Sequence, residues 1–189
     1  MRIVLTGGPG AGKTAILEMI KLKLHEKRII LIPEAASIVF GGGFWRHNTI
    51  YSKIASQRAI YHVQQELEFV VEKENKDFIA ICDRGTLDSI AYWPNDSVEF
   101  WSDVKSSKTD ELKRYDLVIH LRTPTKKLGY NHQNPLRIES PLEAHEIDEK
   151  IIKAWDGHHN RVFIESKNDF LEKANEAILV IENFINKGK

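Results

Sequence analysis

The stretch Gly7-Gly8-Pro9-Gly10-Ala11-Gly12-Lys13-Thr14 decides the fold, because it fits the pattern G-x-x-x-x-G-K-[ST]. It lies between an apolar run, Arg2–Thr6, and an amphipathic stretch, Gly12–Lys27, which is the strand–loop–helix context that the pattern requires. Glycines let successive backbone N–H groups turn inward around an anion, and the helix that follows aims the positive end of its dipole there. The sequence therefore predicts a phosphate-binding loop.

The residue types of this loop also predict what each would hold. Lys13 supplies a point charge for the β- and γ-phosphates, and the Thr14 hydroxyl is placed to bind Mg²⁺. We expect phosphate contacts from Gly7, Gly8, Pro9, Gly10, Ala11, Gly12, Lys13, Thr14 and Ala15. The guanine pattern N-K-x-D fails at Asn75-Lys76, and no D-x-x-G follows the third predicted strand. By elimination, the predicted cofactors are ATP and Mg²⁺.

Length, charge and cysteine count limit the class of protein. The chain has 189 residues, with 27 Lys and Arg against 27 Asp and Glu, so its formal net charge is zero. The length is typical of one domain, 1–189, and the charge balance predicts no nucleic-acid or membrane partner. A single cysteine, Cys82, excludes an internal disulfide and a cysteine-rich zinc module. The apolar runs are shorter than the roughly 20 residues of a membrane helix, so we expect a cytoplasmic protein. The sequence does not indicate its oligomeric state.

Short β-branched runs alternate with longer amphipathic stretches, which is typical of an α/β protein with a parallel sheet. The predicted strands are Arg2–Thr6, Ile29–Ile32, Phe78–Cys82, Asp116–Leu121 and Arg161–Ile164. The predicted helices are Gly12–Lys27, Ala35–Phe40, Asn48–Glu74, Leu87–Tyr92, Pro141–Trp155 and Asn168–Asn186, with mixed structure over Ser97–Tyr115.

Charged residues follow two of the predicted strands, where a parallel sheet places its ligand. Asp83 could hold Mg²⁺ through water or accept a proton, or it could cap the helix Leu87–Tyr92. Glu34 could be a general base for a substrate hydroxyl, or a first-turn acid of the short helix after it. Arg84 could clamp a phosphate or pair with a surface acid. The choice of base between Glu34 and Asp83 stays open.

The long helix Asn48–Glu74 has two faces in the sequence. Ala59, Val63, Leu67 and Val70 are spaced as a core stripe. Gln57, Tyr61 and Gln64 lie on a neighbouring face, three and four residues apart. Such a polar and aromatic face could bind a planar ligand by hydrogen bonds and stacking, or it could be a solvated flank.

Two loops are candidates for covers over the site. Arg122–Ser140 is the least regular stretch, and we expect residues 122–140 to form a lid. Phosphoryl transfer needs positive charge over the transferring group, for which Arg137 is the first choice and Arg122 the second. The glycines Gly41-Gly42-Gly43 could begin a mobile flap or a plain turn.

Several shorter patterns accompany the phosphate loop. They are Pro33-Glu34-Ala35-Ala36, Gln57-Arg58, Asp83-Arg84-Gly85, and the spaced residues Arg137, Glu143-Ala144, Ile147-Asp148, Trp155 and His158. Together they resemble small AAA-type ATP-binding domains related to the kinase domain of nicotinamide riboside kinase, and more broadly P-loop nucleoside and nucleotide kinases. The resemblance covers nearly the whole chain. It implies a three-layer α/β/α fold with a five-stranded parallel sheet in the order 2-3-1-4-5, Mg-ATP, and a lid after the fourth strand.

These observations favour an ATP-dependent phosphotransferase acting on a small acceptor such as a nucleoside or nucleotide. The predicted catalytic residues are Lys13, Glu34, Asp83, Arg122 and Arg137, with Thr14 and Asp83 at the metal. The predicted substrate-binding residues are Glu34, Gln57, Arg58, Tyr61, Gln64 and Arg84. One alternative is an NTPase whose acceptor is water. The other is a regulatory module that changes shape with ATP and exposes an apolar surface at Trp93, Trp101 or Trp155.

Overall fold

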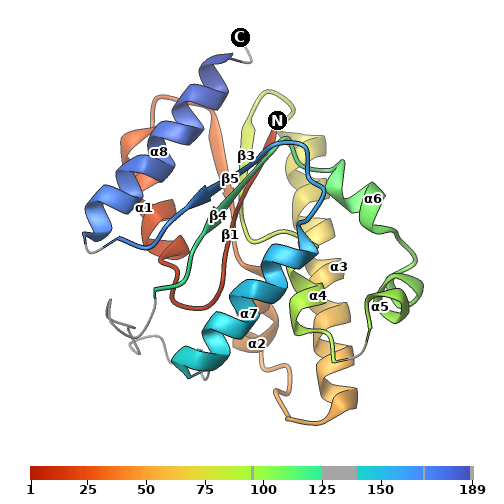
Figure 1. Ribbon diagram of the computed structural model, residues 1–189. Helices are drawn as coiled ribbons and strands as arrows, with labels where there is room; N and C mark the ends of the chain where they lie inside the picture. Colours follow the sequence, from red (N-terminus) through yellow and green to blue (C-terminus); the bar gives the residue numbers. More distant parts are fainter. Residues whose placement is uncertain (95, 125–139, 168, 188–189) are drawn as a thin grey trace.

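Five parallel strands form the centre of the molecule, in the order β2-β3-β1-β4-β5, as the resemblance implies (Figure 1). The computed structural model describes residues 1–94, 96–124, 140–167 and 169–187. The strands are β1 Arg2–Thr6, β2 Ile29–Ile32, β3 Ile79–Asp83, β4 Leu117–Leu121 and β5 Arg161–Ile164. All five lie where the sequence predicts them, to within one residue at either end.

The middle strand, β1, shows why both faces of the sheet must be covered. Ile3, Val4 and Leu5 are all fully buried, although successive side chains of a strand point to opposite faces. A strand apolar on both sides needs cover on both sides, as is usual for parallel sheets. The register places Asp83 of β3 beside Leu5 and His120 of β4 beside Thr6. The carboxyl ends of three strands therefore meet at one edge.

Helices cover both faces of this sheet, which confirms the three-layer α/β/α fold (Figure 1). The helices are α1 Lys13–Lys23, α2 Ala35–Gly41, α3 Ile50–Glu74, α4 Asp88–Tyr92, α5 Ser97–Val104, α6 Lys108–Leu112, α7 Pro141–Ala154 and α8 Phe170–Lys187. Helices α1 and α8 pack against one face in a cluster that includes Ile16 and Ile181. Helices α4 and α7 pack against the other, around Leu87 and Trp155.

Local hydrogen bonds fix where the helices beside the site begin. The Thr49 side chain accepts from the Ser52 amide, so α3 starts at Ile50, two residues later than predicted. At α7, Ser140 and Glu143 form a reciprocal capping box, and the helix begins at Pro141 as predicted.

The interior face of α3 differs from the predicted one. Its buried residues are Ser56, Gln57, Tyr61, Gln64 and Glu68. The predicted core stripe is wrong at Val70, which is 47% exposed; Ala59 and Val63 are half-buried, and Leu67 packs against the core cluster around Leu87 and Trp155. Tyr61 and Glu68 can be buried because they hydrogen-bond to Glu111, Arg114 and Tyr115 from distant parts of the chain, and sequence spacing does not reveal those partners.

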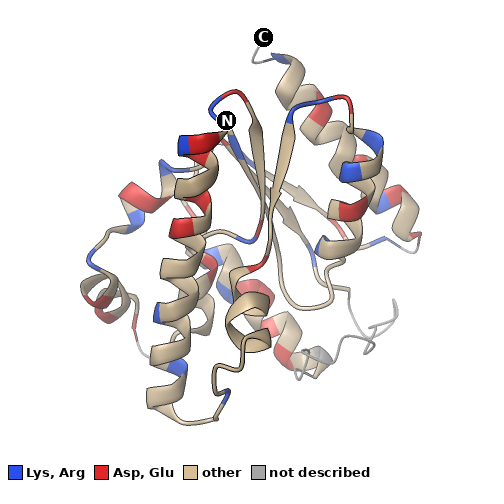
Figure 2. Ribbon diagram, turned by 180° about the vertical axis from the view of Figure 1, so that it is seen from behind, with Lys and Arg blue, Asp and Glu red and all other residues tan. Residues whose placement is uncertain are grey.

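Charged residues are mixed over the surface. Figure 2 shows Lys and Arg positions interspersed with Asp and Glu positions along the helices, in keeping with their equal numbers. Among the described residues, we find no helix with both the length and the apolar character needed to span a bilayer.

Candidate functional site

One cleft of about 1310 Å³ runs along the carboxyl edge of the sheet. At one end it is lined by the glycine-rich loop and the start of α8, and at the other by α2, α3 and α4. It brings together most of the predicted site residues, namely Pro9, Gly10, Ala11, Gly12, Lys13, Thr14, Ala15, Glu34, Gln57, Gln64, Asp83 and Arg84. Residues that lie far apart in the sequence therefore share one cavity, as the strand-end argument predicts.

Two glycines of the loop are needed for its shape. Gly7 has a φ of 137°, and a Cβ there would lie 2.1 Å from the backbone oxygen of Leu121. Gly12 has a φ of 90°, and a Cβ there would lie 2.7 Å from the ring of Phe170. A side chain at either position would be strained and would collide with a neighbour. The pattern thus marks a backbone conformation that only glycine adopts at low cost.

Lys13 is held inside the loop. Its ammonium group donates to the backbone oxygens of Gly7 at 2.9 Å and Gly8 at 3.1 Å, and the residue is only 7% exposed. Burial, together with the charge of Arg84, lowers the pKa of Lys13 to about 8. A phosphate group entering the loop would supply this ammonium with an anionic partner in place of neutral carbonyls.

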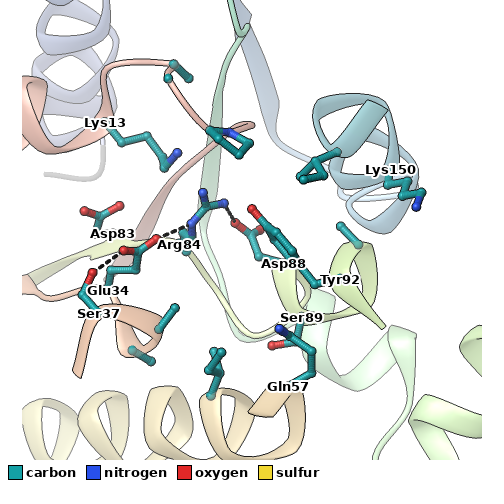
Figure 3. Close-up of a pocket in the computed structure, with 18 of the residues that line it drawn as sticks. Lys13, Glu34, Ser37, Gln57, Asp83, Arg84, Asp88, Ser89, Tyr92 and Lys150 are labelled. Carbon is teal, nitrogen blue, oxygen red and sulfur yellow. Dashed lines mark hydrogen bonds and ion pairs between the residues drawn. The ribbon is translucent and has the colours of Figure 1, made fainter. Parts of the chain in front are cut away.

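Asp83 ends β3 beside Lys13 and Glu34 (Figure 3). It is 6% exposed, and its Oδ1 is buried without a hydrogen-bond partner among the described residues. Burial raises the pKa of Asp83 to about 6, against the opposing charge of Lys13. A buried carboxylate oxygen without a partner is costly and calls for a ligand or a proton.

These surroundings fit a magnesium ion. Thr14 lies exposed on the cleft, so its hydroxyl is accessible, and Asp83 offers the unpartnered oxygen. The described residues contain no group of three or more His, Cys, Asp or Glu that could hold a metal by themselves. Mg²⁺ needs few protein ligands, because it keeps several waters and binds substrate phosphates.

Glu34 is committed to Arg84 and Ser37 (Figure 3). The Arg84 Nε lies 2.7 Å from the Glu34 Oε1, and the Ser37 hydroxyl donates to the other oxygen. Burial alone would raise the pKa of Glu34, but Arg84, Ser37 and Lys13 outweigh it and lower the pKa to about 2. A carboxylate this acidic is a weak general base at neutral pH.

Arg84 links three parts of the site. Besides Glu34, it donates through Nη1 to the Gly7 backbone oxygen and to Asp88, each at 3.0 Å. Its φ of 71° is unusual for a residue with a side chain, which indicates that these contacts hold it in place. Both alternatives from the sequence are therefore incomplete, because Arg84 lines the cleft and yet pairs with buried acids.

Two buried acids that sequence reasoning did not assign to the site brace the loop. Asp88 accepts hydrogen bonds from the Thr6 hydroxyl, Arg84 and the indole of Trp155. Arg84 precedes α4 and has a φ of 71°, so helical spacing did not signal its pairing with Asp88 in the sequence.

Asp148 of α7 is the second of these acids. It accepts from the Gly8 amide at 2.8 Å and contacts the ring of His120 at 2.9 Å. Burial would raise the pKa of Asp148, but the His120 contact and the Gly8 amide lower it. Ile147-Asp148 was part of the resemblance, although it carried no assigned role there.

The start of α8 supports the loop from the other side. Lys173 is 4% exposed and donates to the backbone oxygens of Ala11 at 3.0 Å and Arg122 at 2.7 Å. Burial lowers the pKa of Lys173 to about 8, partly offset by Asp148 and Glu165. In the sequence Lys173 looks like any surface lysine of an amphipathic helix, so nothing there signalled its position.

The far end of the cleft is polar and aromatic. Gln57 and Ser89 face one another there, below Tyr92 (Figure 3). Gln64 and Trp93 also line it, and both are less than 7% exposed. This end has the size and lining of a small-molecule site.

Two predicted substrate-binding residues lie elsewhere. Tyr61 is fully buried, and its hydroxyl donates to Glu111 at 2.6 Å. Arg58 points to the surface and pairs with Asp103. Neither lines the cleft, although both are within four residues of Gln57. On a helix, residues one and four positions away from a cleft-facing residue can point to the core or to solvent.

Of the two predicted lid arginines, the structure describes Arg122, and it does not line the cleft. Arg122 pairs with Glu149 at 2.6 Å and with Asp148 at 3.4 Å, and it is absent from the cleft lining. Its positive charge is therefore used to hold α7 against β4. Arg137 and most of the 122–140 stretch lie outside the described residues.

Comparison with known proteins gives a family match over most of the chain. The model of a family described as the AAA domain matches residues 2–173. The match spans the loop, both strand-end acids, α7 and the buried Lys173. The comparison with curated proteins found no match.

Proposed function

The chain belongs to the AAA domain family of P-loop nucleotide-binding proteins, and on this premise we propose that it transfers the γ-phosphoryl group of Mg-ATP to a small acceptor. A nucleoside, a nucleotide or a similar small metabolite would fit the proposal. The link to nicotinamide riboside kinase stays a prediction of the sequence.

One observation carries the proposal. The cavity that is lined by the phosphate loop is also lined by Gln57, Gln64 and Trp93, which leaves room beside the phosphates. An enzyme whose acceptor is water needs no such room, whereas a phosphotransferase needs a site for its acceptor next to the phosphates. The shared cavity of about 1310 Å³ is large enough for two small ligands.

The residues of the loop end divide the work. Lys13 and the loop amides would hold the phosphates, while Thr14 and Asp83 would hold Mg²⁺. When bound, the ion supplies positive charge to the phosphate oxygens. Arg84 would contribute further charge over the transferring group, fixed by Glu34 and Asp88.

The pKa values bear on the choice of base between Glu34 and Asp83. The pKa of Asp83 is raised to about 6 by burial, whereas that of Glu34 is lowered to about 2. A base works best when its pKa is near the working pH. We therefore favour Asp83 over Glu34 as the group that accepts the proton of the acceptor, and in this role Asp83 would hold Mg²⁺ only through a water molecule, which leaves its Oδ1 free for the proton. Glu34 then orients Arg84 and the acceptor.

The regulatory alternative lacks its expected surface. Trp155 is fully buried and Trp93 is 6% exposed, so neither forms an exposed apolar patch. Trp101 is half-buried and packs on Phe100 with ring centroids 5.0 Å apart. The observation that would carry the alternative is therefore missing at these three residues.

The test is a screen of nucleosides, nucleotides and small metabolites for acceptor-dependent ADP release, with mass spectrometry of the product. At least one acceptor should raise ADP release above the acceptor-free rate and should itself gain a phosphoryl group. Lys13→Ala protein, prepared in parallel, measures any contaminating activity. ADP release that no acceptor changes would favour the NTPase, and bound ATP without turnover would favour the regulatory module.

A further inference from the structure

The buried amide of Gln64 lies at the end of the cleft that the proposed function assigns to the acceptor, and its role as a selectivity group rests on that function. Gln64 is 2% exposed, yet it lines the cavity. Its Nε2 donates to the Oε1 of Glu68 at 2.9 Å, one helical turn further along α3. Glu68 is fully buried. If the amide of Gln64 were turned over, its Oε1 would face Glu68 and its Nε2 would face away from it.

The surroundings of Glu68 leave one arrangement. Its Oε2 lies 2.6 Å from Arg114 and 3.3 Å from Arg2, so the pocket stabilises the carboxylate. A carboxylate has no proton to give and can only accept. Any group in contact with Glu68, including Gln64, must therefore present a donor to it.

A second contact to the same oxygen is also directed. The Tyr115 hydroxyl donates to Glu68 Oε1 at 2.8 Å, and it accepts from the Thr86 amide at 2.9 Å. The Thr86 hydroxyl donates in turn to the carboxylate of Glu111 at 2.7 Å. Both hydroxyl protons in this chain thus point toward a carboxylate, that of Tyr115 to Glu68 and that of Thr86 to Glu111. The network on the side of Glu68 away from the cleft therefore determines which end of the Gln64 amide faces Glu68.

The geometry points to Glu68 as the residue that makes Gln64 a hydrogen-bond acceptor toward the cleft, so that the ligand must present a donor there. With Nε2 held at Glu68, the Oε1 of Gln64 is the end of the amide that lies away from Glu68, and the second N–H stays on the nitrogen beside Glu68. Among the described residues, no hydrogen bond to that oxygen is found. A ligand with an exocyclic amino group satisfies it, whereas a carbonyl in the same place leaves two acceptors facing each other.

The neighbouring residues define the rest of the ligand. Ile60, one turn before Gln64 on α3, and Trp93 supply apolar surface around the amide. Apolar surface beside the directed amide of Gln64 and the polar groups of Gln57 and Ser89 suits a flat heterocycle that carries an exocyclic amine. Glu68 itself does not line the cleft, so it is a positioning residue and not a contact.

Two matched pairs of probes test this polarity, namely cytidine against uridine and adenosine against inosine. Within each pair the amino group of the first is replaced by an oxo group in the second. Binding is measured by calorimetry with the loop occupied by a non-hydrolysable ATP analogue and Mg²⁺. In at least one pair we expect the amino member to bind about tenfold or more tightly. Equal binding, preference for the oxo member, or no binding of any probe would each overturn the proposal.

Two variants separate the role of Glu68 from simple support of the fold. Glu68→Gln permits the amide of Gln64 to turn over, so the preference within the pair should fall to about twofold or less. Gln64→Met removes the amide and should abolish the same preference while leaving Glu68 and its arginines in place. Gln65→Met is the matched control, because Gln65 bonds to Tyr61 and does not line the cleft. A preference that survives in Gln64→Met protein contradicts the proposal even if Glu68→Gln protein does not fold.

A separate measurement distinguishes this inference from the proposed function. ADP release is followed with the preferred probe present. Selective binding without ADP release would refute the phosphotransferase but leave the role of Glu68 standing. Probe-dependent ADP release without selectivity would do the reverse.

Discussion

The two ends of the cleft differ in which groups form them and in how far those groups are already hydrogen-bonded. At the loop end, backbone groups of eight consecutive residues form the site, and side chains such as Lys13 and Asp83 are left without ideal partners. At the α3 end, side chains from distant segments form it, and Gln64, Glu68 and Tyr115 already hold one another. The loop end gains its missing partners from a ligand, whereas the α3 end holds its network together without one and leaves the Gln64 Oε1 and the Trp93 Nε1 for a ligand. We expect the first to govern affinity and the second to govern selectivity.

Removal of Lys13 gives the largest expected effect and tests the loop end. Lys13→Ala should weaken ATP binding by about 100-fold or more, because each hydrogen bond to a charged group contributes about 1.5–3 kcal/mol. Calorimetric titration with ATP and Mg²⁺ measures the change. Lys21→Ala, an exposed position on the same helix, is the control and should bind as the wild type does. Tight ATP binding by Lys13→Ala protein would refute the phosphate-loop assignment.

Asp83 offers a second contrast, because the fold is more stable when Asp83 is protonated, whereas the proposed function needs it as a carboxylate. Burial raises its pKa from the usual 3.8 to about 6, so the folded protein holds this proton more tightly than the unfolded chain. The stability linked to the group is complete below about pH 4 and is lost as the pH rises through 6. At pH 7 the carboxylate thus costs up to about 3 kcal/mol of folding free energy.

Asp83→Asn should therefore raise the free energy of unfolding at pH 7 by about 1–3 kcal/mol, while phosphoryl transfer is lost. Urea titrations of the protein without Mg²⁺ or nucleotide measure the gain, which should shrink toward pH 4. Asp77→Asn, at an exposed position, is the matched control. A variant no more stable than the wild type at pH 7 would show that Asp83 is not strained by its surroundings.

The same contrast explains how far the sequence could be read. The loop is local, since Gly7 and Gly12 adopt their backbone conformations within one short pattern. The strand–helix alternation predicted a parallel sheet, and the resemblance implied its observed strand order. Asp83 could be placed because the end of a parallel strand is itself a local feature.

At the α3 end, the information is not local. Gln57 and Gln64 were identified by their spacing, but the same spacing selected Tyr61, which is bound to Glu111 fifty residues away. Helical period tells which residues share a face but not what that face meets. The roles of Lys173 and Asp148 could not be predicted for the same reason, because their partners are backbone groups of the loop more than 130 residues earlier.

Glu34 tests which acid sets the pH dependence. Glu34→Gln releases Arg84 from its partner, and a shift of this guanidinium should lower turnover about 10- to 100-fold with ATP affinity nearly unchanged. In the wild type, kcat/KM should fall as the pH drops through about 6, because free Asp83 then gains a proton. The variant should keep this limb. If the acidic limb disappears in Glu34→Gln protein, then Glu34 is the base.

Replacement of Arg58 gives the smallest expected effect and tests whether this residue of α3 lies outside the acceptor site. Arg58 follows Gln57 directly, but its side chain is 47% exposed and pairs with Asp103 at the surface. Exposed pairs of this kind contribute about 0–1 kcal/mol, so Arg58→Ala should leave stability within that range and acceptor-dependent turnover unchanged. Gln57→Ala, assayed beside it, should raise the KM for the acceptor. Because the two positions differ by one residue and by about 100° around the helix, a loss of turnover in Arg58→Ala protein would mean that the acceptor site extends beyond the described cleft.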